Sequence, residues 1–391
     1  TVRLRPNAAV QAIRQGFPWI YNNELVLDRR SKKLPAGSVV IVEDCERRPI
    51  GLGGINPDSK IAVRILDRDI EAEIDQTWFL KRLNTALHLR EVLFEQPFYR
   101  LVHAEADGMP GVIIDRFGSL AVVQPNAAWA EMRLAVLSQA LLEVEGITCV
   151  LKNAGGRSRA FEGLDSRNDI LIGEPPETTV DVPMNGAVYK ADLISGQKTG
   201  LYFDQRPNHA FASSLAKGRT VLDVFSHVGG FSLAALAAGA QSALAVDGSA
   251  AALDLAMQGA VASGVVEKFE TQKGDAFAQL SALAEAGEKF GLVICDPPAF
   301  ASSKPALEAG LRAYEKVARL AAHLVEEGGF LVLCSCSHAA DLVKFRTACN
   351  RGIGRAGRSA QLFHTGFAGA DHPLHPQLAE SGYLKALFYR L

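Results

Sequence analysis

Two cysteines and a histidine crowd the stretch "LVLCSCSHAAD", residues 331–341. Cys334, Cys336 and His338 are each two residues apart, so in an extended strand they would share one face, as a metal site requires. Cysteine thiolates also act as redox pairs and as nucleophiles. The spacing alone therefore leaves metal binding, redox chemistry and nucleophilic attack open.

The neighbouring residues favour the nucleophile over the metal. We expect the strand to end before Ser337, and no fourth ligand follows closely in the sequence. The stretch "DHPLH" adds His372 and His375, but two histidines in a proline-containing loop are a weak metal signal. The six cysteines include no C-x-x-C pair, which disfavours a zinc ribbon or a thioredoxin motif. We therefore predict no metal site.

A second reactive loop follows the apolar run in "VICDPPAFASSK". Two consecutive prolines cannot continue a central strand, so the loop after Asp296 is expected to be stiff. Such a loop can hold Asp296 against a planar substrate, and Phe300 can stack on an unstacked base. The alternative is an ordinary exit from a strand.

A glycine pair marks a ligand loop in "VLDVFSHVGGFSLAAL". A strand reaching Asp223 leads through Gly229 into a helix, and the next strand ends at Asp247. The dinucleotide fingerprint G-x-G-x-x-G is absent, which disfavours a pyrophosphate. An acid in the first loop suits a cationic ligand, and S-adenosylmethionine, with its sulfonium and ammonium groups, fits. A turn with helix-packing glycines is an equal alternative. Asp275, in "GDAF", would lie near the adenine amine, or would be a turn or cap residue.

Alternating strands and helices must position these loops. From about residue 219, strands such as "TVLDVFS", "SALAVDGS" and "FGLVICDPP" alternate with helices, which predicts an α/β domain with a mostly parallel, Rossmann-like sheet. Residues 1–70 are expected to form short strands of a small β-barrel, followed by a central α+β region. The predicted domains are 1–72, 73–175 and 176–391.

Composition limits the class of protein. The 391 residues are 48% hydrophobic and 21% charged, with a net charge of −2, as in soluble globular proteins. The first 70 residues hold 12 Lys or Arg against 8 Asp or Glu, so a modestly basic N-terminal module remains compatible with phosphate binding. No apolar run is long enough for a membrane span, and no signal pattern opens the sequence. Sparse cysteines favour a reducing cytoplasm.

Taken in order, these motifs resemble a known family. The chain is similar to the class I S-adenosylmethionine-dependent RNA methyltransferases, and among them to the bacterial large-subunit rRNA cytosine-C5 methyltransferases that carry a PUA domain. The stretches "GFPWIYNNEL" and "GLGGINPDSKIAVRIL" resemble the PUA module, and "RLVHAEADGMPGVIIDRFG" the central domain. "SGQKTGLYFDQRPNH", "DVFSHVGGFSLAAL", "DPPAF", "CSCS" and "DHPLHP" then follow in the family's order.

The resemblance implies roles for individual residues. It implies Cys336 as the nucleophile, with Asp296 holding the pyrimidine. It implies cofactor binding by a set of loop residues: Phe203, Asp204, Gln205, Arg206, Asp223, Phe225, Ser226, Gly229, Asp247, Ser249, Asp275, Ala276, Asp296 and Pro297. Lys198, Arg206 and Phe300 are candidate RNA contacts, although solvated charge explains Lys198 and Arg206 equally well.

The reaction so implied is methylation of cytosine carbon 5 in 23S rRNA. Carbon 5 is a poor nucleophile until a thiolate adds to carbon 6, so one reactive cysteine is required. Many RNA cytosine-C5 enzymes carry a second cysteine after the catalytic proline. This loop has none, so the base that removes the proton is unassigned. Methylation of another base such as guanine, or a non-catalytic RNA-binding or assembly role, are the alternatives. Ribosomal RNA is the expected partner; the oligomeric state, with a homodimer as one option, stays open.

Overall fold

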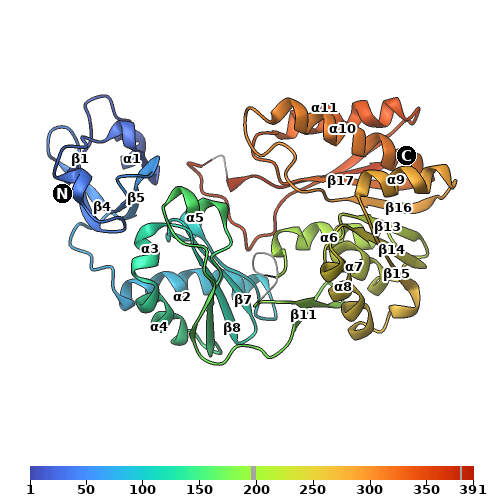
Figure 1. Cartoon of the computed structure of the whole chain (residues 1–391), viewed down its shortest axis with the longest axis horizontal. Helices are drawn as coiled ribbons and strands as arrows, with labels where there is room; N and C mark the ends of the chain where they lie inside the picture. Colours follow the sequence, from blue (N-terminus) through green and yellow to red (C-terminus); the bar gives the residue numbers. More distant parts are fainter. Residues whose placement is uncertain (195–199, 379–380) are drawn as a thin grey trace. The chain divides into compact units, whose positions relative to one another are not determined.

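The computed structural model describes residues 1–194, 200–378 and 381–391 (Figure 1). The chain divides into two compact units. Unit 1 comprises 1–178, 192–200 and 370–381, and unit 2 comprises 179–191, 201–369 and 382–391. The predicted RNA contact Lys198 lies outside the described residues. The predicted three-domain boundaries stay a prediction.

The N-terminal part of unit 1 is a five-stranded sheet, as the short alternating runs predict. Its strand order is β1-β3-β4-β5-β2, and a short helix α1 (Val10–Arg14) precedes β2. The alternating burial of β3 points its apolar residues into a core of small aliphatic side chains. The strands are β1 (Val2–Arg3), β2 (Trp19–Tyr21), β3 (Val39–Glu43), β4 (Pro49–Ile55) and β5 (Ile61–Asp67).

The rest of unit 1 is an α+β layer. Its sheet has the order β10-β9-β8-β7-β6, and α2 and α4 pack on it around Phe79 and Trp129, whose rings stack with centroids 6.0 Å apart. The helical stretch that begins at Ala128 is divided at Arg133 into α3 and α4. The elements are α2 (Gln76–Leu93), β6 (Phe98–His103), β7 (Val112–Phe117), β8 (Leu120–Pro125), α3 (Ala128–Met132), α4 (Leu134–Leu142), β9 (Cys149–Lys152), α5 (Arg157–Phe161) and β10 (Asp169–Ile172).

Unit 2 contains a seven-stranded sheet with the order β15-β14-β13-β16-β17-β19-β18. The first five strands are parallel and follow the doubly wound order, whereas β19 is antiparallel to both of its neighbours. The predicted mostly parallel sheet is therefore confirmed. The strands are β13 (Thr220–Val224), β14 (Ser242–Asp247), β15 (Phe269–Lys273), β16 (Phe290–Cys295), β17 (Val325–Ser335), β18 (Gln361–Gly366) and β19 (Lys385–Arg390).

Helices cover both faces of this sheet (Figure 1). On one face lie α6 (Arg206–Ser214), α7 (Gly230–Ala237) and α8 (Ala250–Ala262), and on the other α9 (Ala276–Glu285), α10 (Leu307–Leu324) and α11 (Leu342–Arg355). A hairpin of β11 (Val180–Met184) and β12 (Ala187–Ala191) packs against α7 and α8. With both faces covered, β16 is apolar and buried along its whole length. The loops after the parallel strands consequently gather at one edge.

Candidate active site

The cysteine-rich stretch divides between a buried strand and the turn after it. β17 ends at Ser335, so Cys334 is inside the sheet and is 1% exposed, whereas Cys336 is half-buried just beyond the strand. Burial, reinforced by the nearby Asp296 carboxylate, raises the pKa of the Cys334 thiol well above its usual range. Cys334 is therefore a packing residue, and Cys336 is the thiol that a substrate can reach.

Two buried serines hold the backbone on either side of Cys336. The Tyr314 hydroxyl of α10 accepts a hydrogen bond from Ser335 Oγ at 2.9 Å and is 2.7 Å from Ser337 Oγ. Ser337 Oγ also accepts from the backbone N–H of Ala301 at 3.0 Å. We call Ser335, Ser337 and Tyr314 the serine clamp. Since Ala301 follows the Asp-Pro-Pro-Ala-Phe stretch, the clamp joins the cysteine turn to the loop that begins with Asp296.

Asp296 follows β16 directly, on the strand next to β17. Its backbone N–H donates to Val224 O at 3.2 Å, and the Gln205 side chain donates to Asp296 Oδ2 at 2.9 Å. Gln205 is itself fixed, because its Oε1 accepts from Asn208 Nδ2 at 2.7 Å. Asp296 is half-buried. The carboxylate is thus oriented from the lead-in segment before β13 while it remains accessible.

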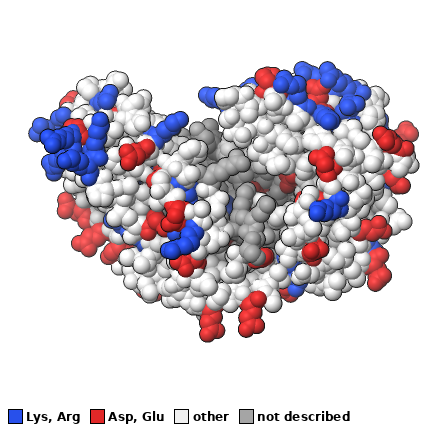
Figure 2. All heavy atoms as spheres, viewed as in Figure 1, with Lys and Arg blue, Asp and Glu red and all other residues white. Residues whose placement is uncertain are grey.

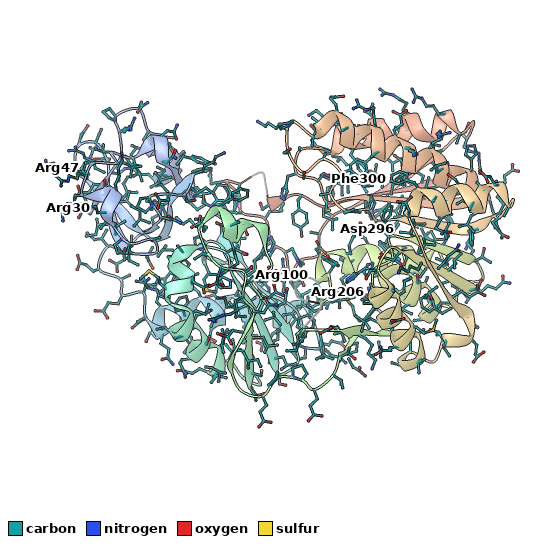
Figure 3. All side chains as sticks on the ribbon, viewed as in Figure 1. Arg30, Arg47, Arg100, Arg206, Asp296 and Phe300 are labelled. Atoms are coloured by element: carbon teal, nitrogen blue, oxygen red, sulfur yellow. The ribbon has the colours of Figure 1, made fainter. Side chains whose placement is uncertain are left out.

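Phe300, which is labelled in Figure 3, lies among three aromatic rings that come from other segments of unit 2. Its ring centroid lies 5.1 Å from that of Tyr314, 6.1 Å from Phe277 and 6.2 Å from Phe225. The ring is half-buried. Phe300 therefore links the clamp tyrosine to the glycine loop, and its stacking on a base stays a prediction.

Two polar side chains are buried at the end of β13: Asp223 in the strand and Ser226 in the loop that follows. Asp223 is fully buried, and its Oδ2 accepts from the Ser232 backbone N–H at 3.0 Å and from Ser232 Oγ at 2.7 Å. Among the described residues, Asp223 Oδ1 and Ser226 Oγ have no hydrogen-bond partner. Burial raises the pKa of Asp223 to about 6. An acid and a hydroxyl left unsatisfied in this way fit a cationic ligand that donates hydrogen bonds.

The same loop has an unusual backbone. Phe225 and His227 have φ angles of 63° and 49°, which non-glycine residues rarely adopt, and Gly229 has a φ of 78° at the start of α7. At the next residue, a Cβ on Gly230 would lie 2.6 Å from the His209 ring. The glycine pair thus serves two needs: one residue makes the turn, and the other lets α6 pack closely on α7.

The acids after β14 and β15 hold the backbone at their strand ends. Asp247 accepts from His227 N at 2.9 Å and from Ser249 N at 2.8 Å. β15 ends at Lys273, so Asp275 lies beyond the strand, where it is exposed and caps α9 by accepting from Ala278 N at 2.9 Å. Asp275 is therefore a helix cap, which was the alternative interpretation. A hydrogen bond to an adenine amine would have to use Oδ2, because Oδ1 accepts from Ala278 N. Ser249 likewise caps α8, and Ala276 is buried.

The lead-in to α6 supplies further polar groups. The Tyr383 hydroxyl donates to Asp204 Oδ2 at 2.6 Å, while Asp204 Oδ1 is buried and has no partner in the described part of the chain. Phe203 is buried, and the Arg206 guanidinium lies 5.3 Å from its ring centroid. Figure 3 shows Arg206 in unit 2, at the start of α6. Pro297, the last of the predicted cofactor residues, is buried.

The histidines near the C-terminus do not join the cysteines. His338 is exposed, and its ring centroid lies 5.4 Å from that of Tyr383. His372 is part of unit 1, where it is buried and its Nδ1 lies 3.0 Å from Asp371 Oδ1. Across residues 1–194, 200–378 and 381–391, no three His, Cys, Asp or Glu side chains form a group that could hold a metal ion.

Residues that the sequence did not single out complete the site. Tyr314 lies on the apolar side of α10, where nothing distinguishes it from a core residue. Lys385 is different: it is the one charged residue in "YLKALFY", on an otherwise apolar strand that is buried. A lone lysine in such a run is a detectable signal, because lysine is rarely buried without a partner.

Comparisons with known proteins agree with this geometry. The sequence profile of the S-adenosylmethionine-dependent methyltransferases matches residues 150–390, and that of a PUA-like domain matches residues 2–68. The chain belongs to the S-adenosylmethionine-dependent methyltransferase family. The predicted recognition, fold class and cofactor are thereby confirmed, and the cofactor of this methyltransferase is S-adenosylmethionine.

Relatives and solved structures extend the match over the whole methyltransferase. The chain is 34% identical over 389 residues to "Ribosomal RNA large subunit methyltransferase I" of Aliivibrio fischeri, covering 97% of both chains. The protein of that name from Photobacterium profundum is 35% identical over 380 residues, covering 96% and 95%. A Streptococcus mutans structure assigned to the SAM-dependent methyltransferases has a TM-score of 0.83 at 19% identity, covering 100% and 99%, and shares the fold. A further structure with the same scores was solved with SAH. Within the described residues, no helix is long and apolar enough to cross a membrane.

Proposed function

We propose that this methyltransferase transfers a methyl group to carbon 5 of a cytosine in large-subunit (23S) rRNA through a covalent adduct with Cys336. The relatives that match it over nearly their full length are named for large-subunit rRNA. The observation that carries the cytosine-C5 proposal is the half-buried Cys336, held by the serine clamp at the end of β17 next to the Asp296 loop.

The residues divide the reaction between them. The Cys336 thiolate adds to carbon 6 of the cytosine, and the ring gains enamine character that makes carbon 5 nucleophilic. Asp296 hydrogen-bonds the pyrimidine edge and stabilises the adduct. S-adenosylmethionine supplies an electrophilic methyl group on its sulfonium. Once carbon 5 carries the methyl group, it gives up its proton to a base, and the carbon–sulfur bond breaks to release Cys336 as a thiolate.

The cofactor would lie against the loops after β13, β14 and β15. Asp223 Oδ1 and Ser226 Oγ supply acceptors for a cationic group, and Asp247 would serve the ribose hydroxyls. We propose that the cofactor set is the one expected from the resemblance, from Phe203 to Arg206 and through the residues after each strand. The structural support for this set is the pair of buried oxygens, Asp223 Oδ1 and Ser226 Oγ, which have no hydrogen-bond partner in the part of the chain that the structure describes.

The N-terminal module would contribute non-specific affinity for RNA. Exposed Lys and Arg gather on its surface, and Figure 2 shows them as a dense blue area over this part of the chain. Phosphates bind such clusters by releasing counterions. The residues are Arg29, Arg30, Lys32, Lys33, Arg47 and Arg48. In unit 2, Arg206 and Phe300 are the proposed RNA contacts among the described residues.

Two variants and one map test the proposal. Bisulfite mapping of 23S rRNA from a strain that lacks the gene should show the loss of one protected cytosine, and the wild-type gene should restore it. Cys336→Ala should not restore it, whereas Cys45→Ala, at an exposed cysteine in unit 1, should. Full cytosine methylation by Cys336→Ala would refute the nucleophile. Methylation of a purine would favour the guanine alternative, and calorimetry without binding of S-adenosylmethionine would favour a non-catalytic role.

A further inference from the structure

A buried lysine reaches the turn that carries Cys336. Lys385 is the first residue of β19 and pairs with Ser335 across the sheet. The residue is only 4% exposed, and its Nζ donates to Ser337 O at 2.8 Å and to Ala340 O at 2.7 Å. Both carbonyls belong to the turn that follows Cys336. The ammonium group of this β19 residue therefore fixes the turn, in addition to the Tyr314 hydroxyl from α10.

Among the described residues, this ammonium meets no carboxylate at ion-pair distance. In the described part of the chain, no Asp or Glu forms an ion pair with Lys385, and Asp341 pairs instead with Lys344. Two carbonyls satisfy hydrogen bonds, but they do not neutralise a buried positive charge, which is costly to leave unpaired. A nearby anion would reduce this cost. Cys336 as a thiolate is such an anion.

The electrostatics link the two residues. Burial lowers the pKa of Lys385, and the largest opposing effect is the charge of Cys336, ahead of that of Asp341. Electrostatic coupling is reciprocal. The Cys336 thiolate opposes the lowering of the Lys385 pKa, and the Lys385 ammonium in turn lowers the pKa of the Cys336 thiol.

The other titratable groups around the turn have separate roles. Burial raises the pKa of Tyr314 to about 12, so its hydroxyl stays neutral at physiological pH. Asp296 lies at the end of the neighbouring β16, and its negative charge would oppose a thiolate. His338 is exposed and packs on the Tyr383 ring. Lys385 is thus the buried cation that can offset Asp296 and favour the thiolate.

We propose that Lys385 is the positioning residue that holds the Cys336 turn and keeps Cys336 as a thiolate before any substrate binds. This proposal deepens the proposed function and rests on it, because only a nucleophilic cysteine needs such a counter-charge. An ordinary thiol with a pKa of about 8.5 is only about 3% thiolate at pH 7. While the thiol is mostly protonated, each pH unit by which a counter-charge lowers its pKa raises the thiolate fraction up to about tenfold.

The test measures thiol ionisation without RNA or cofactor. Iodoacetamide alkylates thiolates, forming a carbon–sulfur bond and releasing iodide, so the rate at each pH reports the thiolate fraction. Mass spectrometry of the Cys336 peptide follows this site alone, and Cys45, which is exposed, serves as a reference in the same protein. The proposal predicts that Cys336 titrates at least one pH unit below Cys45. A titration midpoint for Cys336 equal to or above that of Cys45 in the native protein would overturn the proposal, whatever the variants show.

Variants then assign the effect to Lys385. Lys385→Met should slow alkylation of Cys336 at pH 7 about tenfold and lower kcat by a similar factor, with unchanged affinity for S-adenosylmethionine. Lys385→Gln, which can still donate to both carbonyls, should lose the same charge effect, and Lys385→Arg should restore much of the reactivity. Lys268→Met removes an exposed lysine elsewhere in unit 2 and should change nothing. If Lys385→Met does not fold, the rates of Cys336 alkylation in Lys385→Gln and Lys385→Arg are compared instead, and a slower rate in Lys385→Gln supports the proposal.

An unchanged Cys336 titration in Lys385→Gln would overturn the role of this lysine. Such a result would leave the proposed function intact, because methylation by the native enzyme and its loss in Cys336→Ala are measured separately. Conversely, a low titration point for Cys336 in a protein that does not methylate cytosine would refute the proposed function alone.

Discussion

Replacing Tyr314 with Phe tests whether the serine clamp positions Cys336. The change removes only the hydroxyl that meets Ser335 Oγ at 2.9 Å and Ser337 Oγ at 2.7 Å. The ring keeps its contacts with Phe300 and Phe345, whose centroids lie 5.1 Å and 4.9 Å away. At about 1 kcal/mol for each net hydrogen bond, the free energy of unfolding should fall by about 2 kcal/mol.

The effect on catalysis should exceed the effect on stability. Ser337 keeps its bond from the Ala301 N–H, and Ser335 Oγ keeps the 3.3 Å bond from the Ser337 N–H, but both serines lose their tie to α10, so the Cys336 turn can shift. A misplacement of about 1 Å in a reacting group can cost about 100-fold in rate. We therefore expect kcat for methyl transfer to an rRNA fragment to fall between about 10- and 100-fold, measured with radiolabelled S-adenosylmethionine.

Tyr389→Phe is the matched control. Tyr389 is also buried in unit 2, and its hydroxyl donates one hydrogen bond to Asn350 Oδ1 at 2.8 Å. Its loss should cost about 1 kcal/mol of stability and leave kcat unchanged. If Tyr314→Phe is destabilised as expected but its kcat stays within about twofold of the Tyr389→Phe value, the clamp does not position the nucleophile.

Three further predictions concern the cofactor loop, the helix packing and the RNA surface. The pKa of Asp223 is raised to about 6, so its protonation stabilises the free protein as the pH falls through 6 and weakens binding of a cationic cofactor. The ionised fraction falls from about one half at pH 6 to about one eleventh at pH 5. Calorimetry should therefore show affinity for S-adenosylmethionine falling about fivefold over this range in the native protein, with no such dependence in Asp223→Asn. Gly230→Ala places a Cβ 2.6 Å from a histidine ring of α6, so the free energy of unfolding, measured by thermal denaturation, should fall by about 1–3 kcal/mol. Gly354→Ala, where a Cβ would meet open space in α11, should leave the free energy of unfolding unchanged or raise it slightly. Equal effects of the two substitutions would contradict the packing argument. Arg30→Glu combined with Arg47→Glu should weaken binding of an rRNA fragment and lower the salt dependence of log K by about two; an unchanged slope would exclude this surface from phosphate contact.

Much of unit 2 followed from patterns that are local in the sequence. Apolar strands that alternate with helices fix the parallel sheet, and the loops after β13 and β16 are recognisable because glycine pairs and consecutive prolines restrict the backbone there. Asp275 shows the limit of such reasoning. An acid near a strand end can face a ligand or cap the next helix. Because β15 ends at Lys273, two residues before Asp275, this acid is the N-cap of α9.

The contacts around Cys336 could not be predicted, because the residues that make them come from distant segments. Tyr314 and Lys385 are 22 and 49 positions from Cys336 in the sequence, and only the packing of α10 and the antiparallel insertion of β19 bring them to its turn. The two serines of "CSCS" were visible, but their role was not, since it depends on the tyrosine that they meet. The histidines of "DHPLH" show the converse. His372 follows the cysteine motif in the sequence, but it belongs to unit 1, whereas Cys336 belongs to unit 2.

Trapping of the covalent adduct tests the central claim most directly. Large-subunit rRNA transcribed with 5-fluorocytidine carries a fluorine that no base can remove from carbon 5, so the methylated adduct cannot release the enzyme. Incubation with the native protein and S-adenosylmethionine should give a denaturation-resistant complex, in which mass spectrometry finds the nucleotide attached to Cys336. Cys336→Ala should form none, and Cys45→Ala should form the normal amount. An adduct on another cysteine, or cytosine methylation without any adduct, would contradict the account.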